Sequence, residues 1–139
     1  MILVTPPIRQ ALAANAAARL AALSQGLREP DPVPVVRFFN PVGSATWLAT
    51  EIDNDDILFG LADLGFGCPE LGSFALAELT SLRLPFGLGI ERDLGFEGRH
   101  PLSVYAQAAR RAGSLVLAGR LLDRAAATLN GRRAMPGSG

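Results

Sequence analysis

Four acidic residues stand where a carboxylate can do chemistry: Asp63, Glu70, Glu91 and Asp93. Asp63 ends a mostly apolar segment and Glu70 follows in a glycine-rich stretch, while Glu91 and Asp93 flank Arg92 and share one side of an expected strand. A half-buried carboxylate can act as an acid or a base, and several together can hold a divalent metal. The competing interpretation of Asp63 is structural, because glycine-rich loops expose N–H groups that need acceptors.

The other ionisable groups give weaker signals. Asp53, Asp55 and Asp56 lie within four residues, but their spacing lacks the glycine and the terminal glutamate of a calcium loop, so we interpret them as a solvated turn. His100 is the single histidine and cannot supply a histidine-based zinc site. Cys68 is the single cysteine, which excludes an intrachain disulfide. We predict no metal site and no cofactor.

A second group of residues is suited to binding a partner rather than to catalysis. Trp47 is a core residue or a stacking platform, and arginines on the expected C-terminal helix can contact phosphates or acidic surfaces. The glycine-rich segment 65–72 lacks the lysine of a phosphate-binding loop. The residues that we expect at a binding surface are Thr46, Trp47, Asp63, Glu70, Arg92, Arg110 and Arg111.

Charge is distributed unevenly although the chain is neutral overall, with 13 basic and 13 acidic residues. Residues 51–97 carry ten acids and two arginines, a net charge of −8, and residues 98–139 carry seven arginines and one acid, a net charge of +6. The two regions can neutralise each other within the fold or across a homodimer, or the basic end can bind nucleic acid. We favour neutralisation and keep nucleic acid as the weaker alternative.

The expected helices and strands, which must position these residues, form one α+β domain over 1–139 with its sheet-centred core at 35–94. Apolar residues recur at spacings of three and four in 8–25, which predicts an N-terminal helix, and three prolines in 29–34 predict a linker. The expected strands, three or four in an antiparallel sheet, are 35–39, 44–52, 57–64 and an edge strand near 89–96. The expected helices after the linker are Phe74–Leu82 and a region over 101–130, with Ser103 as N-cap and either one long helix or a pair broken near Gly113.

The central pair reads as a hairpin closed by Asp53–Asp56. In the expected register, opposed residue numbers sum to 109, so Thr46 faces Asp63, Trp47 faces Ala62, Leu48 faces Leu61 and Thr50 faces Phe59. One face then carries Leu48, Ile52, Ile57, Phe59 and Leu61. On the other face, Trp47 covers the gap at Gly60. Because both faces are apolar, we expect layers on both sides of this pair.

Four sequence blocks carry a resemblance to a known family: FFNPVGSATWLATEID, FGLADLGFGCPELGSFAL, LPFGLGIERDLGF and LSVYAQAARRAG. They resemble domain-of-unknown-function family 2958, which is carried largely by plasmids, integrative elements and other mobile DNA of bacteria. The resemblance implies that biological setting but no reaction, because the family has no agreed catalytic residues. Ala75 departs from the family pattern, which has serine there.

Two functions from different classes follow. The first is a non-enzymatic interaction module of a mobile element, in the cytoplasm, that binds a host or mobile-element protein and acts against a defence system of the restriction or CRISPR type. The second is a small metal-dependent hydrolase or nuclease-like enzyme that uses Asp63, Glu70, Glu91 and Asp93. We favour the first, because no specific catalytic motif is present, and we expect no membrane span, since no run of about twenty apolar residues occurs.

Overall fold

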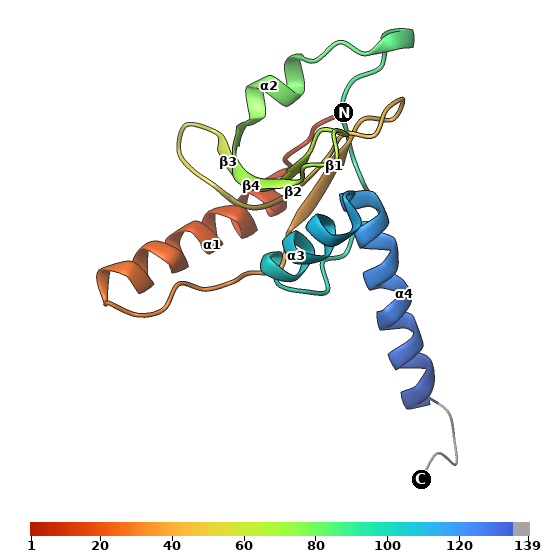
Figure 1. Ribbon diagram of the computed structural model, residues 1–139. Helices are drawn as coiled ribbons and strands as arrows, with labels where there is room; N and C mark the ends of the chain where they lie inside the picture. The colour runs from red at the N-terminus through yellow and green to blue at the C-terminus, as the bar shows by residue number, and fades with distance from the viewer. Residues whose placement is uncertain (135–139) are drawn as a thin grey trace.

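The computed structural model describes residues 1–134 and has the predicted α+β architecture, a sheet with helices on both faces (Figure 1). The helices are α1 Pro6–Ser24, α2 Leu76–Ser81, α3 Leu102–Ala112 and α4 Leu115–Ala134, with a 3₁₀ turn, η1, at Pro85–Gly87. The strands are β1 Val36–Phe39, β2 Thr46–Ile52, β3 Ile57–Asp63, β4 Glu70–Ala75 and β5 Glu91–Arg92. None of the helices in this part of the chain combines the length and apolar character needed to cross a bilayer.

The sheet has five antiparallel strands in the order β4-β3-β2-β1-β5, where three or four were predicted. The additional strand is β4, because residues 70–75 pair with β3 although segment 65–72 was predicted to be an irregular loop. β4 begins directly after Pro69 and contains Gly72. An edge strand needs partners on one side only, so it tolerates this glycine. The helix predicted over Phe74–Leu82 therefore begins later, at Leu76. β5 lies at the opposite edge, as predicted.

The predicted register of the β2–β3 hairpin holds over its first half and fails in its second. Pairing follows the prediction as far as the Ala49–Gly60 pair. Beyond it a β-bulge at Thr50 shifts β2 by one residue, so that Phe59 faces Glu51. The prediction that Phe59 faces Thr50 is therefore wrong.

The bulge moves the end of β2 to the other face of the sheet. Ile52 packs in the same cluster as Trp47, whereas Leu48 packs on the opposite face, so the prediction that Ile52 and Leu48 share a face is wrong. The carbonyl of the bulged Thr50 accepts a hydrogen bond from Nδ2 of Asn15 in α1, at 2.9 Å. The helix thus satisfies a backbone group that the bulge removes from the ladder.

Gly60 is required by the backbone that faces it. A Cβ at this position would overlap the carbonyl oxygen of Leu48 and lie 2.9 Å from the Cα of Ala49. The space beside Gly60 is occupied by the backbone of β2, rather than covered by the Trp47 indole as predicted. Only glycine permits this close approach of the two strands.

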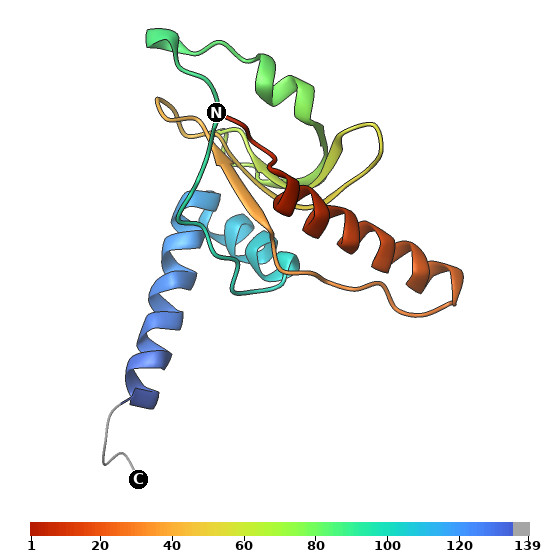
Figure 2. The same cartoon turned by 180° about the vertical axis from the view of Figure 1, so that it is seen from behind.

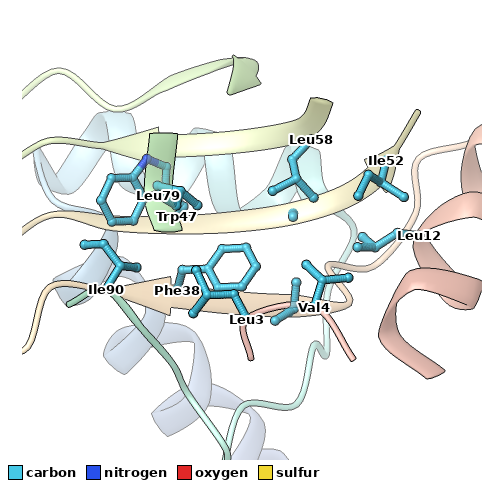
Figure 3. Packing of buried hydrophobic residues seen from close by; sticks show 11 residues of the cluster. Leu3, Val4, Leu12, Phe38, Trp47, Ile52, Leu58, Leu79 and Ile90 are labelled. Carbon is cyan, nitrogen blue, oxygen red and sulfur yellow. The ribbon is translucent and has the colours of Figure 1, made fainter. Parts of the chain in front are cut away.

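Both faces of the sheet are covered, as predicted for the central pair. On one face, Figure 3 shows Leu12 reaching in from α1 and Leu79 from α2, with Leu3 and Val4 of the N-terminal segment beside β1. Each such side chain contributes about 1.5–3 kcal/mol when fully buried. The buried residues of this cluster are Leu3, Val4, Leu12, Val36, Phe38, Trp47, Ala49, Ile52, Leu58, Leu79 and Ile90.

The opposite face is covered by α3 and the first turns of α4. Gly113 has φ +69° and ends α3, so the predicted C-terminal region is a pair of helices and not one long helix. Beyond Leu122, α4 leaves the body of the protein and projects from it (Figures 1 and 2). The buried residues of this cluster are Leu48, Leu61, Leu102, Tyr105, Ala106, Ala109, Leu115 and Ala118.

The proline-rich linker caps the start of α3. Asp31 accepts hydrogen bonds from the backbone N–H of Ser103, at 3.2 Å, and from its hydroxyl. The backbone N–H of Leu102 donates to the carbonyl of Pro32 at 2.9 Å. The prediction that Ser103 is the N-cap is wrong, because Asp31 supplies the acceptor from a distant segment.

Candidate functional site

Asp63 is buried at the end of β3 and both of its carboxylate oxygens bind backbone amides. Oδ1 accepts from Gly65 N at 2.9 Å, and Oδ2 accepts from Leu115 N at 2.8 Å. Leu115 is the first residue of α4, and Oγ of Ser114, the residue before it, accepts from Leu117 N at 3.2 Å. A carboxylate at this position satisfies free N–H groups and complements the helix dipole. The geometry therefore gives Asp63 a structural task.

Thr46, Arg37 and Asp93 form a hydrogen-bonded row on the same face of the sheet. Nε of Arg37 donates to Oγ1 of Thr46 at 3.1 Å, and Nη1 donates to Oδ2 of Asp93 at 2.9 Å. Thr46 donates in turn to the carbonyl of Phe38, and Asp93 Oδ1 accepts from Gly95 N. Thr46 lies opposite Asp63, as predicted. Asp93, like Asp63, thus has both oxygens engaged within the chain.

The other two candidate acids do not join this row in a common site. Glu70 pairs with Ala62 in the ladder, so it points to the face opposite Asp63, and it is exposed. Glu91 pairs with Phe39 at the β5 edge. Among residues 1–134, no three histidine, cysteine, aspartate or glutamate side chains come close enough together to hold a metal ion.

The predicted binding residues are also dispersed. Trp47 is buried, with 5% of its surface exposed, and packs in the core beside Leu79 (Figure 3). Arg92 donates to the carbonyls of Ile2 and Leu3 and so fixes the N-terminal segment. Arg110 and Arg111 are exposed in the last turn of α3, where cations complement the helix dipole. The structure does not gather these residues into one surface.

A cavity of about 250 Å³ lies beside this row, under the start of α4. Its wall includes Tyr105, whose pKa is raised above its usual value by burial, so the phenol stays neutral. The tyrosine oxygen accepts from the backbone N–H of Arg99 at 3.3 Å. The formal charges of two arginines and two aspartates in the wall sum to zero. The residues of the wall are Arg37, Leu48, Asp93, Phe96, Tyr105, Leu115, Val116, Gly119, Arg120 and Asp123.

A larger groove, of about 760 Å³, lies at the other end of the sheet between α1, the linker, the tip of the β2–β3 hairpin and the start of α3. Most of its surface is apolar. One wall is the α1 stripe of Ala13, Ala16, Ala17 and Leu20, and the edge strand β4 contributes Leu71, which is 40% exposed. The floor includes Ile52, Leu58 and Phe59. We call this space the acidic groove, for the charges described next.

Four carboxylates and one guanidinium line the acidic groove, which gives it a formal charge of −3. Nε of Arg19 donates to both oxygens of Glu51, at 3.0 and 3.1 Å, and Glu51 is buried. Glu29 lies at the limit of an ion pair with Arg19, at 4.0 Å, and its side chain is 54% exposed. Asp31 caps α3, and Asp53 accepts from two amides of the hairpin turn. The negative charge of the groove is therefore only partly neutralised within the chain.

The acidic groove was not predicted from the sequence. Glu51 within an apolar strand and Asp31 within a proline linker were visible signals, but their convergence depends on how α1 packs across the bulge. Asp53 lies in the predicted turn, where its carboxylate accepts hydrogen bonds from two amides. His100 precedes α3, and its Nε2 is buried without a partner among the described residues.

Comparison with protein families gives one match. The family described as "Protein of unknown function (DUF2958)" matches residues 3–116. The chain belongs to the DUF2958 family. The DUF2958 match covers the sheet, α1, α2 and α3 and stops just inside α4, so most of the projecting helix lies beyond it. Comparisons with curated proteins and with solved structures give no match.

Proposed function

We propose that this DUF2958 protein is a non-enzymatic protein-interaction module whose acidic groove holds a basic, partly apolar segment of another protein. One observation carries the proposal: an open groove of about 760 Å³ has apolar walls and a formal charge of −3. Apolar contact supplies affinity, and unlike charge selects the partner and speeds the encounter. A segment with arginine or lysine beside leucine-type residues complements both properties.

The positions of the candidate catalytic acids support binding over hydrolysis. Both oxygens of Asp63 and of Asp93 accept hydrogen bonds from within the chain. Glu70 points to the other face of the sheet. A general acid or metal ligand needs an oxygen directed at the substrate. These carboxylates do not direct their oxygens at one shared site. No geometric observation favours the hydrolase alternative.

The proposal includes a biological setting. We expect the protein to act in the bacterial cytoplasm, on behalf of a plasmid, phage or integrative element, by occupying a basic surface of a host restriction or CRISPR complex. Such complexes present arginine- and lysine-rich surfaces for nucleic acid, and an acidic, apolar groove complements a surface of that kind.

Site-specific photocrosslinking in the host tests the site directly. A benzophenone amino acid at Leu71 samples the groove, and the same amino acid at Leu94, which is 76% exposed and lies outside it, serves as the control. We expect position 71 to capture one protein, joined through a segment that contains arginine or lysine. Equal capture from position 94, or no capture from position 71, would contradict the proposal.

A matched pair of variants tests the biological role. Glu29→Arg with Leu71→Arg changes two exposed groove residues, and Glu97→Arg with Leu94→Arg makes the same chemical changes outside the groove. Wild type should raise the transformation of unmodified plasmid DNA into a restricting host. The groove variant should lose this effect and the control should keep it. Protection that survives in the groove variant would argue against the groove.

A further inference from the structure

Helix α4 has a face that no other part of residues 1–134 covers. After Leu122 the helix leaves the body, as both views of the ribbon show (Figures 1 and 2). Leu117, Leu121 and Leu129 are 44%, 50% and 56% exposed. Leu129 lies in the projecting part, and Leu117 and Leu121 lie on the outer side of the first turns, which pack on the body. Because helices in water are stabilised mainly by packing of an apolar face, these exposed leucines indicate a missing neighbour.

The charges of α4 complement those of the acidic groove. Residues 115–134 contain four arginines and one aspartate, a formal charge of +3, against −3 for the groove lining. Arg120 and Arg124 follow Leu117 and Leu121 at a spacing of three, which places cations and leucines along one side of the helix. The described contacts include no ion pair for these two arginines.

The groove has a wall shaped to receive a helix. Its α1 stripe, Ala13, Ala16, Ala17 and Leu20, follows the spacing of three and four that forms a ridge on a helix. Small side chains let a second helix approach closely, since interaxial distance depends on the residues at the contact. Leu20 is 58% exposed although it belongs to this stripe. An amphipathic helix laid in a groove is a common mode of recognition.

We propose that α4 of one copy occupies the acidic groove of a second copy, and that the exchange is reciprocal in a two-fold dimer. One chain carries both an uncovered basic helix and an unfilled acidic groove, and a two-fold axis satisfies both at once. The helix segment after residue 116 lies outside the DUF2958 match, whereas the groove residues lie within it.

The dimer also regulates the groove. The proposed partner uses the same groove, so one copy cannot form the dimer and bind the partner at the same time. This mutual exclusion rests on the proposed function, whereas the dimer itself does not. Dissociation of α4 would open the groove, so the partner must compete with a helix held at high local concentration.

Sedimentation equilibrium of three full-length variants tests the dimer. Wild type and the control Glu97→Arg/Leu94→Arg should be dimers that weaken as salt rises. Arg120→Glu/Arg124→Glu changes the formal charge of residues 115–134 from +3 to −1, and Glu29→Arg/Leu71→Arg changes that of the groove lining from −3 to 0. Each variant alone should therefore be a monomer. Their mixture should form a heterodimer, because one of its two interfaces then joins the unchanged basic helix to the unchanged acidic groove. A monomeric wild type, or a groove variant that still dimerises through α4, would overturn the proposal.

Two further measurements show whether the variants are folded and distinguish the dimer proposal from the partner proposal. Circular dichroism should show native helix content in both variants, and a labelled peptide of residues 115–134 should bind the folded helix variant, whose own groove is intact. An absence of peptide binding to that folded monomer would also overturn the dimer. Photocrosslinking from position 71 in the helix variant then tests the partner proposal independently, because no dimer competes.

Discussion

Replacement of Asp63 by alanine should destabilise the fold by about 3 kcal/mol, since it removes the acceptor of two amides. A buried N–H left without a partner costs about 1–3 kcal/mol, and loss of a helix cap costs about 0.5–2 kcal/mol. Gly65 N and Leu115 N both lose their partners at 2.9 and 2.8 Å, and Asp63 is only 3% exposed. Asp63→Asn keeps one acceptor oxygen, so its loss should be about half as large.

Urea unfolding followed by circular dichroism measures this loss, with the m-value as the check that the unfolding transition is unchanged. Glu70→Ala removes an exposed carboxylate at the other end of the same loop and should stay within about 0.5 kcal/mol of wild type. Hydrogen exchange should show faster exchange at the amide of Leu115 in Asp63→Ala. A change below about 0.5 kcal/mol in Asp63→Ala would refute the structural role and return Asp63 to the list of catalytic candidates.

Three further predictions follow from the same contacts. Gly60→Ala should destabilise the fold by about 2 kcal/mol or more, because the new Cβ meets the backbone of Leu48. Gly72 lies opposite Gly60 in β4, and a Cβ there would have nothing within 4 Å, so Gly72→Ala should be neutral. Thermal unfolding compares the two variants. Arg19→Ala should cost about 2 kcal/mol, because Glu51 is then buried unpaired, and Arg19→Ala/Glu51→Gln should recover part of it in a double-mutant cycle. Burial raises the pKa of Tyr105, so folding favours the neutral phenol, and stability should fall as pH rises above about 10. The absorbance of the tyrosinate form of this single tyrosine measures its titration. Unfolding of Tyr105→Phe should lack the decline in stability.

The architecture could be predicted because its signals are local. Apolar spacing located α1, and a turn rich in aspartate located the central hairpin with its register as far as Gly60. Gly113 supplied the break between α3 and α4, which the sequence presented as one of two alternatives. Each of these features depends on residues close together in the chain, where spacing and turn chemistry decide the outcome.

The features that escaped prediction depend on contacts between distant segments. The bulge at Thr50 is stabilised by Asn15 of α1, and the residue types in β2 do not predict it. β4 forms directly after Pro69 and includes Gly72, because β3 provides an edge for pairing. Asp31 caps α3 across 72 residues of sequence. These are tertiary effects that override local propensity.

The candidate site divides in the same way. Sequence context identified Asp63 and Thr46 and placed them opposite each other, and also gave the structural alternative for Asp63 that its two amide contacts support. The acidic groove was out of reach, because Glu29 and Glu51 come together only through the packing of α1 against the end of the hairpin. Arg19 is the residue that links them, and its position in an alanine-rich helix carries no signal of that task.

The most direct test of the central claim is the affinity of the captured partner for the groove. Titration of that partner against the monomeric helix variant Arg120→Glu/Arg124→Glu, with and without Glu29→Arg added, isolates one exposed groove carboxylate. We expect Glu29→Arg to weaken binding by about tenfold, or about 1.4 kcal/mol, at low salt and by less at high salt. Equal affinity with and without this substitution, together with no effect of salt, would contradict binding in the acidic groove.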